Sequence, residues 1–460
     1  MDKHDAISPL DYRYYTGEVF DRLQPYLSET AAINYLVKVE VALVKTLAEK
    51  KICSEKAAKE IEEAARKVTA SDVYQEEERI KHNIRALVNC IRRNVSEQAK
   101  PFVHFTATSN DIISTAEAMR ARDAVQKVLL PELAELEKVM IELAEREADT
   151  LQIGRTHGQH AEPITFGFTI ASYVSRLGGR ILKMKEAAEN MRGKFAGAVG
   201  AYNASSLLIK NPEEFEKAIL EKLRMKPGSH ATQLVEAEYM TDLMHSITST
   251  MGVLANIADD MRHLQRSEIA EVYEKFEAQQ VGSSTMPHKR NPINFENVKS
   301  MWKEFMPRMV TVYSDQISEH QRDLTNSASS RFNTEIIAAA VIAAQRLRRV
   351  MARLRVDKEN MKKNFDAGRA MIAAEPAYIL LAALGHPDAH EVVRQKTLEA
   401  EKTGKKLVDI LLREKELKDY MKKLAKGQLE ILRNPEMYTG IAAEKTRKVC
   451  EEWKTKLAIK

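Results

Sequence analysis

Long, nearly uninterrupted stretches of helical periodicity constrain the fold of this 460-residue chain more than any other feature. Within them apolar residues recur every three or four positions, as on one face of an α-helix. The stretches cover residues 30–50, 55–68, 80–97, 112–148, 165–193, 233–266, 294–320 and 332–354. Glycine (17 residues) and proline (13 residues), which interrupt helices, are scarce. Such a pattern predicts an all-α bundle and excludes β-sandwiches and β-barrels.

Three features refine this expectation. Pro131 lies inside the 112–148 stretch and should kink or break it, because proline lacks a backbone donor and clashes one turn back. Glu40 interrupts the apolar stripe of residues 30–50, which predicts incomplete burial there. The segment 332–354 is apolar on nearly all sides, as in helices that are buried on most sides. We therefore expect a second subunit to cover it.

The charge balance and the cysteines exclude several classes of protein. Basic residues exceed acidic ones by 71 to 66, and this dispersed net charge of +5 is too small for a dedicated nucleic-acid-binding protein. Cys53, Cys90 and Cys450 are odd in number and far apart, so no disulfide framework is expected. The first 20 residues lack an apolar signal core, and the longest apolar run, Ile336–Ala344, is too short to cross a bilayer. We expect a cytoplasmic protein that binds neither nucleic acids nor membranes.

Helix-breaking residues cluster in four loops, and loops carry much of the function in helix-rich proteins. The loops cover residues 154–163, 193–202, 226–230 and 279–292. The last of them, QQVGSSTMPHKRNP, contains hydroxyl, imidazole, ammonium, guanidinium and amide groups in one short segment. A surface turn would explain its glycine, serine and proline residues. The density of polar groups favours a functional site.

Two histidines, His157 and His160, lie three residues apart in the first of these loops. Zinc would need at least a third ligand, and neither a His-Glu-x-x-His motif nor a cysteine cluster supports one. The sequence therefore predicts no metal site. An acid–base role for one histidine is the better functional interpretation, because imidazole titrates near neutral pH. The alternative is a hydrogen-bonded histidine in a helix-capping loop.

A further polar segment, His104–Asp111, precedes a predicted helix. Thr108, Ser109 and Asp111 are good N-cap residues, so an ordinary cap would explain them. A cap does not explain His104. The free N–H groups of a helix N-terminus also bind anions, and a substrate carboxylate or phosphate would fit there.

Together these segments resemble the signature regions of the fumarase/aspartase superfamily. GSSTMPHKRNP is similar to its signature loop, Gly-Ser-Ser-x-x-Pro-x-Lys-x-Asn, while THGQ and His-x-x-x-Thr-Ser-x-Asp resemble its other two regions. The resemblance covers essentially the whole chain. It implies an all-α, three-domain fold whose central long-helix bundle forms the core of a homotetramer. The implied domains are an N-terminal helical domain (1–108), the central bundle with the signature loop 279–292 (109–360) and a C-terminal helical domain (361–460).

Within the superfamily the chain is most similar to the adenylosuccinate lyase family. Four segments carry this similarity: SPLDYRY (8–14), ERIKHN (78–83), MPHKRNP (286–292) and EHQRD (319–323). Three positions depart from the family pattern. Asn83 replaces a usual aspartate, Thr106 replaces a common glycine, and Ala237-Glu238 replaces a usual Arg-Asp.

This resemblance implies β-elimination of fumarate from a purine nucleotide substrate, with no cofactor and no metal. It makes Ser283 the base, with Ser284 as the second choice, and makes His157 the acid that Glu296 orients. Lys289 favours the alkoxide of the base. Each site is built from three subunits. The implied substrate-binding residues are Arg13, Tyr14, His82, His104, Thr108, Ser109, Gln233, Met286, Asn291, Arg322, Ser327 and Arg331.

Other functions remain open at this point. Argininosuccinate lyase usually has Gln-Lys-Lys in the signature loop and fumarase has Gly-Lys-Val, and residues 288–290, His-Lys-Arg, match neither well. A 3-carboxymuconate cycloisomerase can share His-Lys-Arg, but Arg13 and Arg322 favour a phosphorylated substrate. An inactive helical scaffold, like the lens proteins recruited from this superfamily, is the third alternative. The presence of all four implied catalytic residues argues against it.

Overall fold

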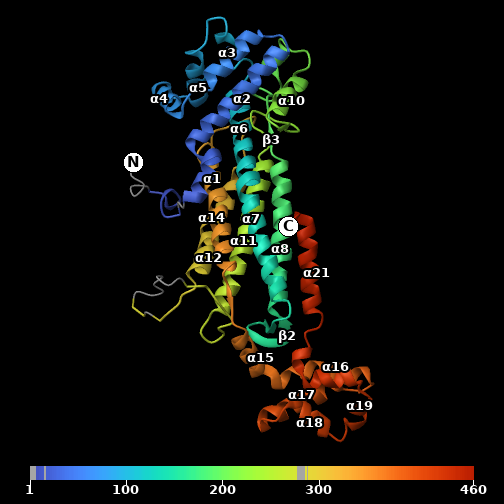
Figure 1. Cartoon of the computed structure of the whole chain (residues 1–460). Coiled ribbons are helices and arrows are strands. Elements are labelled where there is room, and N and C mark those ends of the chain that lie inside the picture. Colours follow the sequence, from blue (N-terminus) through green and yellow to red (C-terminus); the bar gives the residue numbers. More distant parts are fainter. Residues whose placement is uncertain (1–6, 15–16, 277–284, 287, 460) are drawn as a thin grey trace. The chain divides into compact units, whose positions relative to one another are not determined.

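The fold is that of a computed structural model, which describes residues 7–14, 17–276, 285–286 and 288–459 (Figure 1). Ser283 and Ser284, the two candidate bases, lie outside the described residues. The chain divides into two compact units, each discontinuous in sequence. The first comprises residues 1–134, 179–254 and 300–345, and the second comprises 135–178, 255–299 and 346–460. This partition differs from the three predicted domains, which stay a prediction.

Helices dominate both units, so the predicted all-α class is confirmed. The N-terminal helices are α1 (Gly17–Leu27), α2 (Glu29–Glu49), α3 (Glu55–Ala65), α4 (Ala70–Ile80), α5 (Asn83–Arg92) and α6 (Ser109–Ala124). The long helices after them are α7 (Leu130–Arg146), α8 (Phe166–Glu189), α11 (Glu238–Leu264), α12 (Ile293–Phe305) and α14 (Asn333–Met351). Shorter elements are α9 (Asn203–Ser206), α10 (Pro212–Lys222), α13 (Arg308–Ser314), and the 3-10 turns η2 (Pro9–Asp11), η3 (Lys100–Phe102) and η5 (Ser329–Phe332).

Two of the predicted helices have different bounds. The helix expected over 80–97 covers only the end of α4 and all of α5, because Lys81 adopts the left-handed conformation (φ 56°) and ends α4. The helix expected over 294–320 is divided into α12 and α13, with Pro307 at the N-cap of the second. In both places a single residue at the junction redirects the backbone. Hydrophobic periodicity does not predict the position of such a residue.

The expected break at Pro131 does not occur. A five-residue π-helical turn, η4 (Val125–Leu129), joins α6 directly to α7. Proline lacks an N–H group and its ring crowds the carbonyl group one turn earlier. The wider π turn immediately before it provides room for that carbonyl group, so the helix continues through residue 131.

Among the described residues, strands are short and occur in pairs. The antiparallel hairpin of β1 (Leu151–Thr156) and β2 (Gln159–Thr165) was expected to be part of a loop. β3 (Arg192–Gly193) pairs in parallel with β4 (Lys226–Pro227), and β5 (Val272–Tyr273) is antiparallel to β6 (Arg355–Val356). Breaker-rich segments therefore fold as small hairpins or ladders between the long helices.

Two expectations about burial are wrong. Glu40 is only 2% exposed, because His104 Nδ1 lies 2.6 Å from its carboxylate and compensates for its burial. In α14, the side chains of Ile336–Ala344 are buried within the single chain, apart from the partly buried Ala338. This helix therefore needs no second subunit to cover it.

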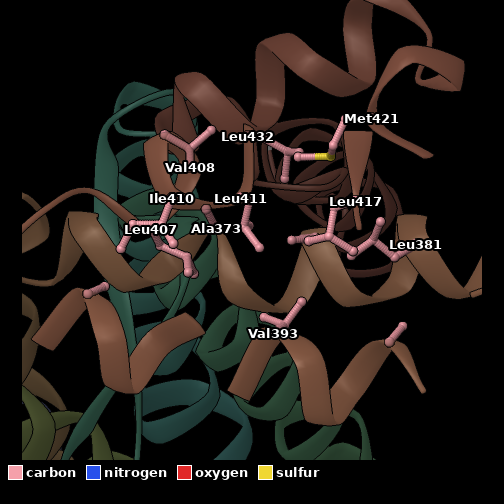
Figure 2. Packing of buried hydrophobic residues seen from close by; sticks show 13 residues of the cluster. Ala373, Leu381, Val393, Leu407, Val408, Ile410, Leu411, Leu417, Met421 and Leu432 are labelled. Carbon is pink, nitrogen blue, oxygen red and sulfur yellow. The ribbon is translucent and has the colours of Figure 1, made fainter. Parts of the chain in front are cut away.

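The C-terminal part forms a compact group of short helices. They are α15 (Lys358–Ile372), α16 (Ala374–Ala383), α17 (Ala389–Thr403), α18 (Leu407–Arg413), α19 (Lys418–Lys423) and α20 (Lys426–Arg433), with the turn η6 (Pro435–Met437). Leu381, Val393, Leu411, Leu417 and Leu432 belong to their apolar core (Figure 2). No described helix combines the length and the apolar character needed to cross a bilayer.

The last helix, α21 (Ala442–Leu457), packs against two long helices of the second unit. A Cβ atom on Gly178 of α8 would lie 2.3 Å from the Trp453 ring, so only glycine permits this close approach. Lys454 Nζ lies 2.6 Å from the Glu145 carboxylate of α7. The buried Cys450 lies against the Ile141 carbonyl oxygen, at 3.9 Å.

Candidate active site

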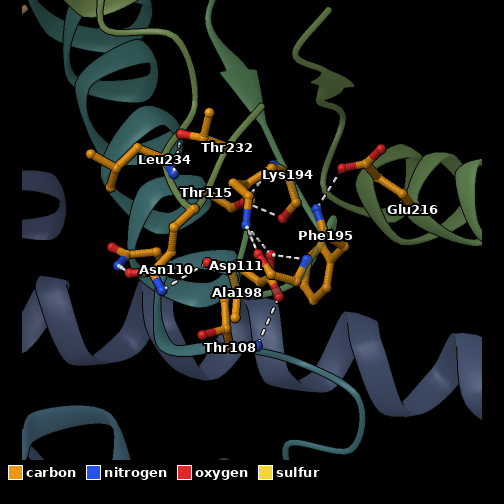
Figure 3. Close-up of polar contacts among 12 residues, drawn as sticks. Thr108, Asn110, Asp111, Thr115, Lys194, Phe195, Ala198, Glu216, Thr232 and Leu234 are labelled. Atoms are coloured by element: carbon orange, nitrogen blue, oxygen red, sulfur yellow. Dashed lines mark hydrogen bonds and ion pairs between the residues drawn. The ribbon is translucent and has the colours of Figure 1, made fainter. Parts of the chain in front are cut away.

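The N-terminus of α6 is the centre of a polar network in the first unit (Figure 3). Asp111, 1% exposed, accepts hydrogen bonds from the backbone N–H groups of Thr108 at 2.8 Å and Gly197 at 3.2 Å. It also forms an ion pair with the fully buried Lys194, whose ammonium donates to the Gly197 carbonyl at 3.1 Å. One carboxylate thus joins the start of the helix to the 193–202 loop.

This ion pair also sets the charge at the helix N-terminus. A carboxylate in the first turn of a helix stabilises the helix, but an isolated one would repel an anion that binds at the same end. The Lys194 ammonium compensates the negative charge of Asp111 from the interior. The N-terminus of α6 therefore remains suitable for binding an anionic group.

Gln233 connects this helix to Arg322. Its Oε1 accepts hydrogen bonds from Asn110 Nδ2 at 3.2 Å and from Arg322 Nη1 at 2.8 Å, and its Nε2 donates to the Ala198 carbonyl at 3.0 Å. Three residues assigned to the substrate, Thr108, Gln233 and Arg322, thus belong to one network. Among the described residues, the buried Arg322 Nε has no hydrogen-bond partner. A guanidinium donor left unpaired in this way suits an anionic ligand.

A recess of about 330 Å³ lies in the same unit, and the segments 230–241 and 312–333 form much of its lining. Ala237 and Glu238, where the family usually has Arg-Asp, both line it. Glu117 also lines it, and burial raises the pKa of its carboxyl more than neighbouring arginines lower it. The departure from the family pattern therefore replaces a cation with a neutral methyl group in an acidic recess.

The two histidines assigned to the substrate in this unit have different environments. His104 has a left-handed backbone (φ 63°) and pairs with buried Glu40. Burial lowers the pKa of His104, but the charge and hydrogen bond of Glu40 outweigh burial and leave that pKa raised. His82 is exposed, and its Nδ1 accepts a hydrogen bond from the Arg85 backbone N–H at 3.2 Å, which caps α5.

The remaining assigned residues of this unit are less constrained. Ser109 begins α6, and Tyr14 is partly buried just after η2. Arg13, Ser327 and Arg331 are exposed, and no hydrogen bond joins them to Gln233 or Arg322 in the described chain. The structure therefore brings together only part of the expected phosphate site.

In the second unit, His157 lies in the exposed turn of the β1–β2 hairpin, with a left-handed backbone (φ 53°). The hairpin is fixed by Glu271, whose side chain is fully buried. Its carboxylate accepts hydrogen bonds from Arg155 Nη2 at 2.6 Å, Gln152 Nε2 at 2.9 Å and Asn364 Nδ2 at 2.8 Å. The imidazole is thus presented to solvent from a rigid support.

Glu274 holds the two ends of the signature loop together. Its carboxylate accepts hydrogen bonds from the N–H groups of Asn294 at 2.9 Å and Phe295 at 3.0 Å, and from Asn294 Nδ2 at 2.7 Å. Gln265 adds a second link, because it accepts from Glu274 N at 3.0 Å and donates to the Arg290 carbonyl at 3.3 Å. Burial raises the pKa of Glu274. These hydrogen bonds therefore fix the residues that bracket the loop.

Four assigned residues lie at the C-terminal end of this loop. Met286 and Lys289 are exposed, and a hydrogen bond of 3.0 Å joins Lys289 N to the Met286 carbonyl. Asn291 is partly buried, and Glu296 is exposed on α12. In the described part of one chain, no hydrogen bond joins Glu296 to His157. Within a single copy the proposed acid and its orienting carboxylate are not paired.

Comparison with known proteins identifies the family. A family model described as lyase matches residues 16–306, and one described as adenylosuccinate lyase C-terminal matches residues 318–438. The adenylosuccinate lyase of Archaeoglobus fulgidus is 34% identical, over 96% of this chain and 98% of its own length. That of Pyrococcus abyssi is 35% identical, over 95% and 96%. The chain belongs to the adenylosuccinate lyase family.

More distant similarities extend across the superfamily. The N-acetyl-S-(2-succino)cysteine lyase of Enterococcus italicus is 28% identical to this adenylosuccinate lyase family member, over 94% of both chains. The solved fumarate lyase from Mesorhizobium sp. BNC1 has a TM-score of 0.82 at 23% identity and covers 94% of this chain and 97% of its own. The 3-carboxy-cis,cis-muconate lactonizing enzyme from Pseudomonas putida has a TM-score of 0.80 at 24% identity, with 94% and 97% covered. These two structures share the fold.

Sequence reasoning missed the supporting residues of this lyase. Lys194 and Glu271 are buried partners of Asp111 and Arg155, and Glu274 secures the loop ends. Lys194 lies in the glycine-rich segment 193–202, which was recognised only as a loop. The described residues contain no group of three or more His, Cys, Asp or Glu side chains placed to hold a metal ion.

Proposed function

We propose that the chain catalyses β-elimination of fumarate from adenylosuccinate, giving AMP, and from the succinyl-aminoimidazole-carboxamide ribotide, giving the carboxamide ribotide. The observation that carries this proposal is the match to adenylosuccinate lyases along nearly the whole chain, at 34% and 35% identity. The Gln233–Arg322 network supports an anionic substrate, because it leaves a buried guanidinium donor unpaired among the described residues.

The reaction needs a base, an acid and donors for negative charge. Ser283 removes a proton from the carbon next to the bond that breaks, with Ser284 as the second candidate. The electron pair spreads into the adjacent carboxylate and then forms the double bond of fumarate as the C–N bond breaks. His157 gives a proton to the departing nitrogen, so both products leave complete. Positioned acids and bases contribute on the order of 10²–10⁴-fold each.

The charged groups of the substrate require their own partners. Lys289 and Asn291 hold the succinyl carboxylates together with Thr108 and Ser109 at the N-terminus of α6. Lys289 also favours the alkoxide of the base. Preorganised donors of this kind stabilise the dianion without reorganising, which usually makes them the largest contribution to catalysis.

The nucleotide part has further partners in this proposal. Arg13, Arg322 and Arg331 bind its phosphate, because guanidinium groups make paired contacts with phosphate oxygens. Tyr14, His82, His104, Gln233, Met286 and Ser327 complete the substrate pocket. The exposure of Arg13, Ser327 and Arg331 in one chain is consistent with a pocket that other copies help to build.

The active form in this proposal is a homotetramer with shared sites. One face of α13 and its flanks exposes Met306 (40%), Val310 (69%), Tyr313 (45%) and Ile317 (74%) at helical spacing. An apolar stripe of this kind supports self-association. The absence of a hydrogen bond between His157 and Glu296 in the described part of one chain supports it as well. We place the enzyme in the cytoplasm, which suits three buried free cysteines.

The activity is tested by mixing the purified protein with adenylosuccinate and following the purine absorbance as AMP forms. We expect turnover by the wild-type protein and by the control Ser172→Ala, which changes an exposed serine on α8. Ser283→Ala and His157→Ala should each lose at least about 100-fold in kcat. Absence of turnover by the wild type would refute the function, and near wild-type rates of both variants would refute the mechanism. N-acetyl-S-(2-succino)cysteine is the competing substrate to test, because Ala237 and Glu238 alter the recess.

Shared sites are tested by mixing two inactive variants. Ser283→Ala and His157→Ala chains, dissociated together and reassembled, should regain about a quarter of wild-type activity, because each residue is intact in half of the chains. Either variant reassembled alone is the control. No recovery in a mixture that is demonstrably tetrameric would mean that each chain builds its own site.

A further inference from the structure

A second cavity of the first unit lies apart from every residue assigned to the substrate. Its volume is about 660 Å³, within the range of small-molecule sites. Residues of α2, α3, α6, η4, α8 and α10 line it, together with residues of the turns after α3 and α10. In the described part of the chain, seven of its lining residues are lysine or arginine and three are carboxylates. The cavity is therefore distinctly cationic in a chain whose overall charge is nearly balanced.

One side of the cavity is built around Asp123. Lys127 Nζ lies 2.9 Å from its carboxylate and Arg122 Nη2 lies 2.8 Å from it, so two cations share one anion. The buried Tyr35 hydroxyl donates to the same carboxylate at 2.8 Å. Burial opposes ionisation, but these donors and cations outweigh it and lower the pKa of Asp123. This group keeps one positive charge in excess.

A second group of the lining repeats the arrangement around Glu62. Lys45 Nζ lies 2.8 Å from its carboxylate, and Arg66 also pairs with it. Again two cations share one carboxylate, and the pKa of Glu62 is lowered, chiefly by its hydrogen bond with Lys45. The cavity lining thus contains two groups that each carry an excess positive charge.

Lys38 adds a further cation to the lining. It has no carboxylate within ion-pair distance among the described residues, and its ammonium lies 3.9 Å from the centre of the Tyr35 ring. Burial and the charge of Lys127 lower the pKa of Lys38 by more than the charge of Asp123 raises it. An ammonium in such surroundings gains stability when an anion binds beside it. Arg224, a further lining cation, is held in the left-handed conformation (φ 54°), and its carbonyl accepts a hydrogen bond from Arg122 at 2.6 Å.

We propose that this cavity is a second anion site, separate from the substrate site, which binds a small molecule carrying two or more phosphate groups. Two cationic groups in the lining of one cavity match a ligand with more than one negatively charged group. A concave cavity suits a compact ligand, whereas a nucleic-acid strand needs a continuous basic track. Phosphate oxygens are the acceptors that arginine and lysine bind most strongly.

Inorganic tripolyphosphate is the probe, titrated calorimetrically into the full-length protein at low ionic strength. We expect one site per chain with a Kd that Lys38→Gln/Lys127→Gln weakens at least about tenfold. The matched control is Lys56→Gln/Lys217→Gln, which removes two exposed lysines outside the cavity in the same unit, and its Kd should stay within about twofold of wild type. Glu62→Gln should tighten binding about threefold or more, since it removes a competing carboxylate. Because misfolding would weaken binding, tighter binding by Glu62→Gln cannot result from misfolding.

Several results would overturn the proposal. They are the absence of binding by wild type at millimolar tripolyphosphate, an unchanged Kd in the Lys38→Gln/Lys127→Gln variant, and loss of binding in Arg322→Gln, which would assign the ligand to the substrate site. Single-stranded RNA that binds more tightly than tripolyphosphate and is lost in the same double variant would make this a nucleic-acid surface instead.

Discussion

At the scale of single residues, the buried Lys194–Asp111 pair shows what motif matching overlooks. The motif supplied Thr108, Gln233 and Arg322, which lie in one network. It did not supply Lys194, because the two partners are 83 residues apart and the pairing arises only from folding. Spacing within a motif reports local structure, whereas buried charge compensation depends on tertiary contacts.

Loss of this lysine should destabilise the protein strongly. Lys194→Met leaves Asp111 buried and unpaired, which costs roughly 3–5 kcal/mol of the free energy of unfolding, measured by urea denaturation. Lys194→Met/Asp111→Asn should recover much of that loss, because neither charge remains. The control Lys183→Met breaks an exposed pair, 64% and 61% exposed, and should cost less than about 1 kcal/mol. Equal urea concentrations at the midpoint of unfolding for Lys194→Met and for the control would contradict this account of the network.

His104 should make stability depend on pH. Its pKa in the folded protein is raised above the ordinary value of 6.5, so its contribution is fully present below about pH 6.5 and is lost as the pH rises through the folded pKa. The unfolding free energy of the wild type should therefore fall relative to that of His104→Gln between pH 6 and pH 9, which are about the limits of the titration. His390→Gln removes an exposed histidine of α17 and is the control. A difference that stays constant over this range would rule out the proposed ionisation.

At the scale of elements, the sequence predicts the long helices well and their interruptions poorly. Helical periodicity located α2, α8, α11 and α14 within a few residues. It could not foresee the π turn before Pro131, because a π turn changes the hydrogen-bond register without changing composition. It also read the β1–β2 hairpin as a loop, since a short hairpin rich in glycine and histidine lacks the alternation of a longer strand.

The hydrogen bonds by which Glu274 holds the ends of the signature loop should be needed for a normal turnover rate. Glu274→Ala leaves three hydrogen-bond donors at the start of α12 without their partner, which costs about 1–3 kcal/mol of stability. The signature loop then loses its fixed ends, and misplacing reactive groups by about 1 Å lowers kcat on the order of 100-fold. Steady-state kinetics of adenylosuccinate cleavage would measure this. Glu304→Ala, an exposed change on the same helix, should leave kcat unaltered, and an unaltered kcat in Glu274→Ala as well would show that these hydrogen bonds are dispensable.

At the scale of the whole molecule, the two units are assembled from alternating pieces of the chain. Their boundaries fall inside α7, α8, α11, α12 and α14, so the long helices supply residues to both. The residues assigned to catalysis and binding are divided in the same way, with Gln233 and Arg322 in the first unit and His157 in the second. The sequence alone predicts which residues belong to the site. In the homotetramer that we propose, other copies of the chain complete the site, and a single sequence does not display them.

The docking of α21 has a consequence for shortened chains. Trp453 covers Gly178 of α8 and Cys450 contacts the Ile141 carbonyl of α7, so α21 completes a surface formed by residues made some 270 to 310 positions earlier. A chain cut short before α21 leaves this surface uncovered, and we expect such a polypeptide to be degraded rather than to persist as a slightly shortened enzyme.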